Sequence, residues 1–235
     1  MSDPAALRAR LDGVRERVAA AAHRAGRDRD SIRLVAISKT FPADAVRAAA
    51  HAGQIDFGEN KVQEAAQKIA ACADLDVSWH LVGHLQSNKA RKAAALFNVI
   101  HSVDSTSLAL KLDEAAGEAN RTVNWLIQVD LAGEATKHGA RPDDLEAIVS
   151  AAHACRSARL IGLMLLPPAV EDPEAARPYF RSLVRLRDQL VRGGLNPAML
   201  SELSMGMSHD FEIAIEEGAT MVRVGSAIFG QRHYP

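Results

Sequence analysis

Hydrophobic and polar residues alternate between short apolar runs and longer amphipathic runs along all 235 residues of the chain. Eight short runs are rich in Val, Ile and Leu, and several are almost continuously apolar. Such runs are typical of parallel strands that are buried on both faces. We expect strands at residues 32–38, 54–57, 79–82, 99–101, 125–131, 160–165, 200–204 and 221–225.

Helical patterns occupy the segments between these strands, at residues 43–51, 60–71, 88–96, 107–116, 142–153, 174–192 and 209–217. One further helix, at 5–25, precedes the first strand. Strands that alternate with helices predict βαβ units with parallel pairing. Eight of them favour a closed (β/α)8 TIM barrel of the α/β class with an extra N-terminal helix. We find no shift in composition, and expect a single domain over residues 1–235.

The charge balance gives no sign of a nucleic-acid or membrane partner. The 28 basic and 29 acidic residues leave a net charge of −1, without an attraction for polyanions. No apolar run is long enough for a membrane span, and the N-terminus carries no signal peptide. Cys72 and Cys155 lie far apart without a CxxC motif, which is typical of a reducing compartment. We therefore expect a cytoplasmic protein.

Lys39 is the most informative single residue, because it lies at the carboxyl end of the first predicted strand. Burial disfavours the charged ammonium group and lowers the pKa of a lysine. An amine that is neutral near pH 7 can form a Schiff base with an aldehyde. The alternative is a strand-end lysine whose charged head extends to solvent.

Glycines and small hydroxyl side chains follow the seventh and eighth predicted strands, in the segments Ser204-Met205-Gly206 and Gly225-Ser226. Glycines let a backbone approach a ligand closely, and exposed N–H groups favour an anion. Barrels often bind phosphate at these two loops. Ordinary turn chemistry explains either loop alone. Opposite a strand-end lysine, the two loops together indicate a phosphorylated carbonyl ligand.

Arg223 lies two residues before Gly225, so its side chain faces the same side of the strand. An inward arginine needs a partner, because a buried unpaired charge is costly. Two interpretations stay open: an ion pair with a barrel carboxylate such as Asp130, or a donor to a ring atom of the ligand.

Other titratable residues carry weaker signals. His80 and His84 have the spacing of a metal pair, but residues four apart on a strand lie about 13 Å from each other. We therefore set a metal aside. Glu59 and Glu64 are candidates for acid–base groups, but they are more typical of a helix-start carboxylate and a solvated helix face.

Six longer motifs contain most of these residues: Val35-Ala-Ile-Ser-Lys-Thr, Phe57-Gly-Glu-Asn, Trp79-His-Leu-Val-Gly-His-Leu-Gln-Ser-Asn-Lys, Gly162-Leu-Met, Leu203-Ser-Met-Gly-Met-Ser and Met221-Val-Arg-Val-Gly-Ser-Ala-Ile-Phe-Gly. In this order they resemble the pyridoxal phosphate homeostasis protein family, also called the YggS or PROSC family. The resemblance runs from about residue 32 to residue 234. It implies a barrel similar to the N-terminal domain of bacterial alanine racemase, which is fold type III of the proteins that bind pyridoxal 5′-phosphate (PLP).

The resemblance also assigns roles to particular residues. It implies PLP bound as a Schiff base to Lys39, with Arg223 near the pyridine nitrogen and Asn60 near the cofactor. The remaining expected contacts hold the phosphate and come from Ser204, Met205, Gly206, Gly225 and Ser226. One departure is Lys61, which stands where the family usually has an aromatic residue.

The family resemblance favours a PLP-binding protein of cofactor homeostasis without robust catalysis. A racemase needs a second acid–base group opposite the lysine, and in alanine racemase a tyrosine from a second domain of the partner subunit supplies it. The chain ends just after the eighth predicted strand, so we expect no such domain, and its tyrosines are Tyr179 and Tyr234. An arginine at the ring nitrogen also weakens the ring as an electron sink.

We therefore predict a monomeric, non-catalytic carrier that binds PLP, with apo PLP-dependent enzymes as candidate partners. The alternative is a small PLP-dependent amino-acid racemase. A phosphate-binding barrel enzyme such as an aldolase is disfavoured by the motif set.

Overall fold

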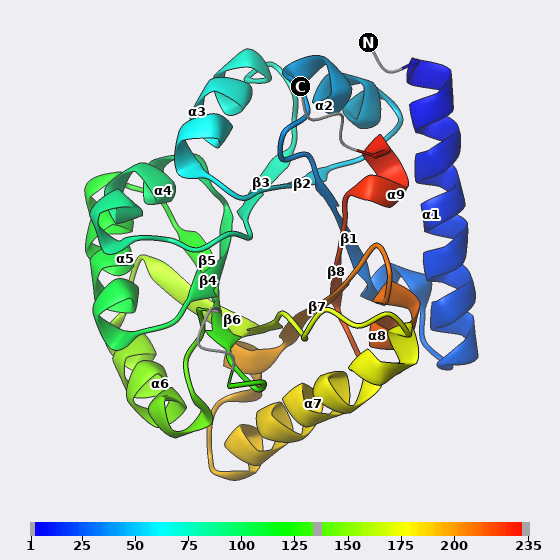
Figure 1. The fold of residues 1–235 in the computed structure, drawn as a ribbon. Coiled ribbons are helices and arrows are strands. Elements are labelled where there is room, and N and C mark those ends of the chain that lie inside the picture. The colour runs from blue at the N-terminus through cyan, green and yellow to red at the C-terminus, as the bar shows by residue number, and fades with distance from the viewer. Residues whose placement is uncertain (1–2, 134–137, 232–235) are drawn as a thin grey trace.

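The computed structural model describes residues 3–133 and 138–231. Eight parallel strands form a closed barrel in sequence order (Figure 1). Pairing of the last strand with the first closes the barrel, with Val35 opposite Arg223. The strands are β1 Arg33–Ile37, β2 Asp56–Glu59, β3 Ser78–Leu81, β4 Val99–Val103, β5 Val123–Val129, β6 Ala158–Leu165, β7 Glu202–Met207 and β8 Met221–Val224. The predicted (β/α)8 fold is confirmed.

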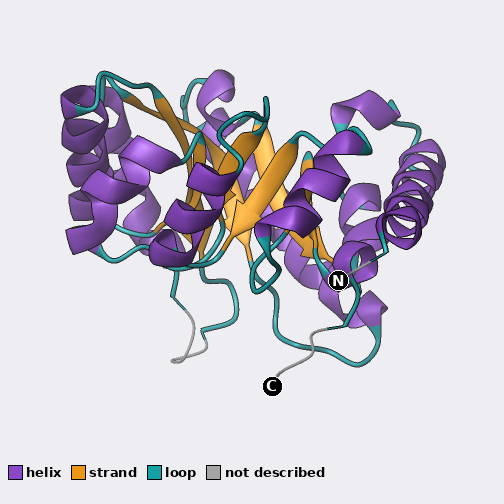
Figure 2. Cartoon of the chain, turned by 90° about the horizontal axis from the view of Figure 1, so that it is seen from above, coloured by secondary structure: helices purple, strands orange, loops and turns teal. Residues whose placement is uncertain are grey.

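Helices surround the barrel on all sides, as the two perpendicular views show (Figures 1 and 2). They are α1 Pro4–Arg24, α2 Ala43–His51, α3 Val62–Ala71, α4 Ala90–Leu96, α5 Thr106–Glu118, α6 Leu145–Ala154, α7 Arg177–Arg192, α8 Phe211–Glu216 and α9 Ser226–Phe229. The predicted extra helix is α1, which packs against α2, α8 and α9. The sequence pattern missed α9 because one turn is too short to show a period. No helix in the described ranges combines the length and apolar character that a bilayer crossing needs.

Every strand differs from its predicted bounds by one to three residues at one or both ends, and two of these differences have an identifiable cause or consequence. The β2 strand starts at Asp56 rather than 54, because the buried Gln54 amide donates to the backbone oxygens of Leu34 and Asp56 and shapes the approach to the strand. The β7 strand continues to Met207, three residues beyond its predicted end. Ser204 therefore lies within the barrel wall rather than in the loop above it.

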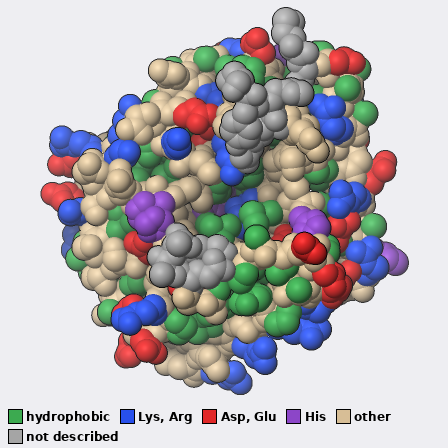
Figure 3. All heavy atoms as spheres, in the orientation of Figure 1, with side chains coloured by type: hydrophobic (Ala, Val, Ile, Leu, Met, Phe, Trp, Pro, Cys, Tyr) green, Lys and Arg blue, Asp and Glu red, His purple; other side chains and the backbone are tan. Residues whose placement is uncertain are grey.

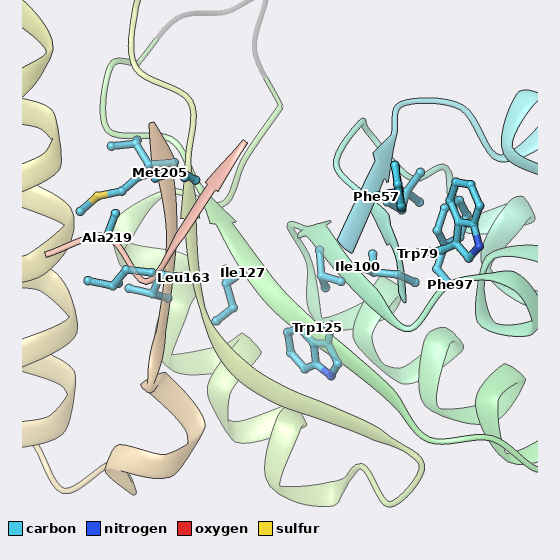
Figure 4. Close-up of a cluster of buried hydrophobic side chains, with 14 of the residues drawn as sticks. Phe57, Trp79, Phe97, Ile100, Trp125, Ile127, Leu163, Met205 and Ala219 are labelled. Atoms are coloured by element: carbon cyan, nitrogen blue, oxygen red, sulfur yellow. The ribbon is translucent and has the colours of Figure 1, made fainter. Parts of the chain in front are cut away.

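The main apolar core lies between the barrel and the helices. Strand residues alternate between the two faces, and the outward ones include Phe57, Trp79, Trp125, Leu163 and Met205 (Figure 4). The Phe57 and Trp79 rings lie 5.8 Å apart between their centroids. Because this layer anchors every helix, it fixes the loops that carry the candidate site.

The inside of the barrel is different, because polar and charged residues occupy much of it. Only two small apolar clusters lie there in the described part of the chain, Val35-Ile37-Val82 and Val99-Leu126-Met164. Between them lie buried polar side chains, namely His80, His101, Gln128, Ser204 and Arg223. Branched apolar residues usually dominate barrel interiors, so these polar groups need a structural or functional reason.

Gly162 on β6 provides a test of the barrel register. A methyl group there would lie 1.9 Å from the backbone oxygen of Glu202 on β7, whereas nothing lies within 4 Å of such a group at Gly13 on α1. We expect Gly162→Ala to lower the free energy of unfolding by about 1–3 kcal/mol. The control Gly13→Ala should raise it by about 0.5–1 kcal/mol, since alanine favours helix. Urea unfolding followed by circular dichroism measures both, and equal stabilities would contradict the register.

Candidate functional site

A pocket of about 500 Å³ opens at the carboxyl ends of the strands. Five of the residues predicted for the site line it: Lys39, Asn60, Arg223, Gly225 and Ser226. Lys39 follows β1, and Asn60 follows β2. Arg223 lies on β8, Gly225 follows it, and Ser226 begins α9. This face of the molecule is hollowed at its centre, with histidine side chains on opposite sides of the hollow (Figure 3). The barrel therefore brings a lysine, an arginine and a hydroxyl loop to one pocket.

The segment 204–206 is a correction to the predicted site, because none of its residues is among those that line the pocket. Ser204 is buried in the barrel wall, and Met205 packs in the outer core. Gly206 has a φ of +90°, and a methyl group there would lie 2.6 Å from the Cβ of Ala214, so this glycine lets α8 approach the strand. The longer β7 strand moves the lining of the pocket beyond this segment.

Met207, Ser208 and His209 line the pocket in its place. The Gly225 N–H donates to Ser208 Oγ at 3.1 Å, which joins the loops after β7 and β8. Two serines therefore line the same pocket, Ser208 after the end of β7 and Ser226 at the start of α9. The segments after β7 and β8 therefore both contribute to the pocket lining, the first through residues 207–209 rather than 204–206.

A turn with an unusual conformation follows Lys39. Thr40 has a φ of +69°, in the left-handed region that a β-branched residue rarely adopts. Its backbone N–H donates to Glu64 Oε1 at 2.6 Å, and the Phe41 N–H donates to Ser38 O. The sequence had indicated that Glu64 only covers a solvated helix face. In the structure it holds the turn after Lys39.

A buried ion pair supports the backbone on the other side of Lys39. Lys68 Nζ lies 2.6 Å from Glu59 Oε1 and also donates to Ser38 O at 2.7 Å. The Ser38 hydroxyl donates to the same Glu59 oxygen. Burial raises the pKa of the Glu59 carboxyl, and the Lys68 ammonium opposes that shift. Because Ser38 and Glu59 directly precede Lys39 and Asn60, this pair fixes two of the pocket residues at once.

Arg223 is buried beneath the pocket and is held by neutral groups. Its Nη1 donates to Ser204 Oγ at 2.7 Å, and its Nη2 donates to Leu165 O at 2.8 Å. The ion pair with Asp130 that the sequence left open does not form, because that carboxylate accepts from the backbone of Ala132 and Gly133. Burial lowers the pKa of Arg223 to about 10, so it remains a cation at neutral pH.

His80 and His84 point to different surroundings, as the strand spacing predicts. His80 is buried inside the barrel, where its Nε2 lies 2.9 Å from Asp56 Oδ1 and its Nδ1 lies 2.9 Å from His101 Nε2. Burial lowers the pKa of His80, and burial together with His80 lowers the pKa of His101 well below its usual range. Sequence reasoning missed His101, whose signal was a polar residue inside a buried strand.

His84, Asp104 and His138 gather at the pocket mouth, each from the loop after a successive strand. Their donor atoms all lie within 4.8 Å of one another. The two imidazole rings are stacked, with centroids 3.6 Å apart and an angle of 12° between their planes. Imidazole lone pairs lie in the ring plane, so nearly parallel rings do not direct two of them at one ion. We therefore assign no metal here, and treat the two rings as part of the pocket wall.

Comparison with known proteins places the chain in a family. Residues 9–233 match the family model of the alanine racemase N-terminal domain. A pyridoxal phosphate homeostasis protein of Aquifex aeolicus is 44% identical over 225 residues, which cover 96% of this chain and 98% of the relative. The chain belongs to the pyridoxal phosphate homeostasis protein family. The predicted resemblance is confirmed.

Solved structures agree with this family membership. The structure of PipY from Synechococcus elongatus PCC7942 with PLP bound has a TM-score of 0.84 and 40% sequence identity, and the match covers 95% of this chain and 100% of PipY. An alanine racemase of Clostridium difficile 630 has a TM-score of 0.73 at 16% identity, over 97% of this chain and 57% of the racemase. The second likeness establishes the shared barrel fold alone.

The buried histidines predict how stability depends on pH. The folded protein holds His80 and His101 neutral, so the unfolded chain binds more protons once the pH falls below about 6.5. Their contribution to stability is complete above that pH and is lost below it. We expect the free energy of unfolding to be about 1–3 kcal/mol lower at pH 5.5 than at pH 7.5.

Urea unfolding at the two pH values measures this loss. The double variant His80→Gln/His101→Gln serves as the comparison, because it lacks both titrating rings and should lose less stability on acidification. An equal loss in the variant and the parent protein would contradict the assignment.

Proposed function

We propose that the chain binds PLP in this pocket and holds it for release to other proteins, without robust catalysis. The observation that carries the proposal is the convergence of Lys39, Arg223 and the Ser208 and Ser226 loops on one pocket. The relatives support it, because PipY has a structure with PLP bound and the Aquifex relative is a pyridoxal phosphate homeostasis protein.

The pocket suits a phosphorylated aromatic aldehyde in size and chemistry. Its volume of about 500 Å³ lies within the range of small-molecule sites. The Ser208 and Ser226 hydroxyls, on loops joined through Gly225, would donate to the phosphate oxygens. Hydrogen bonds to a charged group contribute about 1.5–3 kcal/mol each, so we propose that the phosphate accounts for much of the affinity.

Lys39 and Arg223 would define the position of the ring. We propose that the Lys39 amine forms a Schiff base with the aldehyde, since the Thr40 turn and the Glu59–Lys68 pair fix its backbone. Arg223 would face the pyridine nitrogen as a hydrogen-bond donor, with Asn60 beside the cofactor. Bound PLP supplies an electron sink, and a cation at the ring nitrogen disfavours the ring protonation that strengthens this sink.

The positive charge of Arg223 and the residues that line the pocket favour a carrier over a racemase. Among the described lining residues there is no tyrosine, the residue type that alanine racemase uses opposite its lysine. Tyr179 packs against the outer core on α7, and Tyr234 lies outside the described residues. Three histidines do line the pocket, at positions 84, 138 and 209, and would be the acid–base candidates if turnover were found.

The proposal also covers the domain organisation, the oligomeric state and the cellular location of the protein. We propose that residues 1–235 act as one monomeric domain in the cytoplasm, where apo PLP-dependent enzymes would receive the cofactor. Both cysteines, Cys72 and Cys155, are unpaired, which supports a reducing compartment.

Substitution of Lys39 tests the mode of binding. The protein mixed with PLP should develop a visible absorption band that borohydride abolishes, because a Schiff base extends the conjugation of the ring. Lys39→Ala should lack this band and still bind PLP through its phosphate. The exposed Lys61, one residue beyond Asn60, provides the control, and Lys61→Ala should keep the band. A parent protein without a band would contradict the Schiff base, and equal affinity for pyridoxal would contradict the phosphate assignment.

A mixing assay tests the carrier role. Protein loaded with PLP should restore the activity of an apo PLP-dependent enzyme, while L-alanine and other L-amino acids remain largely unconverted to D-products or keto acids. Turnover near the median enzyme rate of about 10 per second would show that the protein is an enzyme. Binding without transfer would leave PLP binding in place and contradict the carrier role.

A further inference from the structure

A continuous chain of hydrogen bonds crosses the inside of the barrel, from Asp56 through His80, His101 and Ser204 to Arg223. We refer to these five residues as the interior chain. From Asp56 Oδ1 onward, the first three contacts measure 2.9 Å, 2.9 Å and 2.8 Å, and the last, from Arg223 Nη1 to Ser204 Oγ, measures 2.7 Å. His80, His101 and Ser204 are fully buried, so water does not interrupt the chain at these residues.

With both rings neutral, the carboxylate at one end fixes the direction of every hydrogen bond. A guanidinium group only donates, so Ser204 Oγ accepts from Arg223 and its own proton is available for His101 Nδ1. His101 then carries its proton on Nε2 and donates to His80 Nδ1. An ionised carboxylate only accepts, so His80 must present Nε2–H to Asp56. The Arg223 end is compatible with this orientation, and neutral rings in the other tautomer would set two lone pairs against each other at Asp56.

The charge state of the rings is consistent with this direction. A doubly protonated His80 would also satisfy Asp56, but it would reverse the bond to His101 and add a cation inside the barrel. Burial lowers the pKa of His80 in spite of its contact with Asp56. The nearby Arg33 and Arg223 further disfavour a proton on His101. Both rings are therefore neutral at pH 7.

Such a chain holds a charge in place rather than moving a proton. Transfer along it would require Arg223 to give up a proton, and its pKa of about 10 keeps it protonated at neutral pH. The buried cation needs compensation, since its second hydrogen bond goes to the neutral Leu165 O. The charge of Asp210, which raises the pKa of Arg223, supplies part of this compensation. An oriented chain that ends on a second anion adds to it, because each donor polarises the next.

Asp56 itself lies at the opposite end of the barrel from the candidate site. It lines a separate hollow near the amino ends of β1 and β2, together with Asp30 and Arg33. None of the residues that line this hollow also lines the ligand pocket. We propose that Asp56 acts along the interior chain as a positioning residue, which orients Arg223 and sets the charge that it presents to the ligand ring. The part of this inference that concerns the ring rests on the proposed binding of PLP.

The first test needs neither PLP nor a substitution. Nitrogen-15 NMR of the histidine side chains in the protein without PLP should show neutral rings for His80 and His101 at pH 7.5, both protonated on Nε2. An Nδ1–H tautomer or an imidazolium ring at either position would overturn the assigned direction.

The second test changes the charge at the far end. Asp56→Asn keeps an oxygen that can accept from His80 and removes the negative charge. We expect it to shift the side-chain Nε–H resonance of Arg223 in the protein without PLP. With PLP added, it should shift the visible band and weaken binding by about 2- to 30-fold, the range for sites that are coupled through a hydrogen-bond network. The matched control is Asp30→Asn, which removes an exposed acid from the same hollow and should change none of these readouts.

The outcomes separate this inference from the proposed function. If the Arg223 resonance is as little shifted in Asp56→Asn as in the control Asp30→Asn, the positioning role is overturned, even where PLP binds normally. If the parent protein fails to bind PLP, the proposed function fails, and the tautomers and the Arg223 resonance still decide whether the interior chain acts as described.

Discussion

The buried charge of Arg223 is the constraint on which the arrangement of the barrel depends. A guanidinium group that leaves water loses a large hydration free energy, which only well-placed acceptors can offset. Leu165 O and Ser204 Oγ are such acceptors, but both are neutral. The charge of Asp210 offsets part of the loss, and the hydrogen-bond network continues from Ser204 through two histidines to a second carboxylate. The polar interior of the barrel is therefore a consequence of placing one cation below the pocket.

Strand alternation makes this arrangement compatible with a stable fold. Outward residues such as Trp125 and Leu163 form the apolar layer under the helices, while the inward neighbours on the same strands are free to be polar. The layer that stabilises the fold and the chain that holds Arg223 are thus separated by the barrel wall. A second polar cluster, the Glu59–Lys68 pair, lies below Lys39 and fixes the end of β1.

The sequence predicted the fold, and it predicted several residues that the structure brings to one pocket, for identifiable reasons. Lys39 and Arg223 could be found because a strand-end position and a period of two are local patterns. Ser204 was assigned to the phosphate loop because the pattern ended β7 too early, and the extra strand residues turn it into the barrel. The gathering of His84, Asp104 and His138 depends on three loops that are distant along the chain, which no local pattern records. Glu59 resembled a helix-start residue because its partner Lys68 lies nine residues later, within α3.

Two separate sets of contacts hold Lys39 and Arg223 in place, and they bear on the function of the pocket. Lys39 is held from below by the ion pair and from its far side by the Glu64 contact to Thr40, while Arg223 is held by the interior chain. Neither support uses a group that would reach a ligand carbon or exchange protons with it. A site built in this way fixes the two ends of a ligand without supplying an acid–base group from either support. Any acid–base group for turnover would therefore have to come from the pocket lining itself, where Lys39 and the histidines at positions 84, 138 and 209 lie.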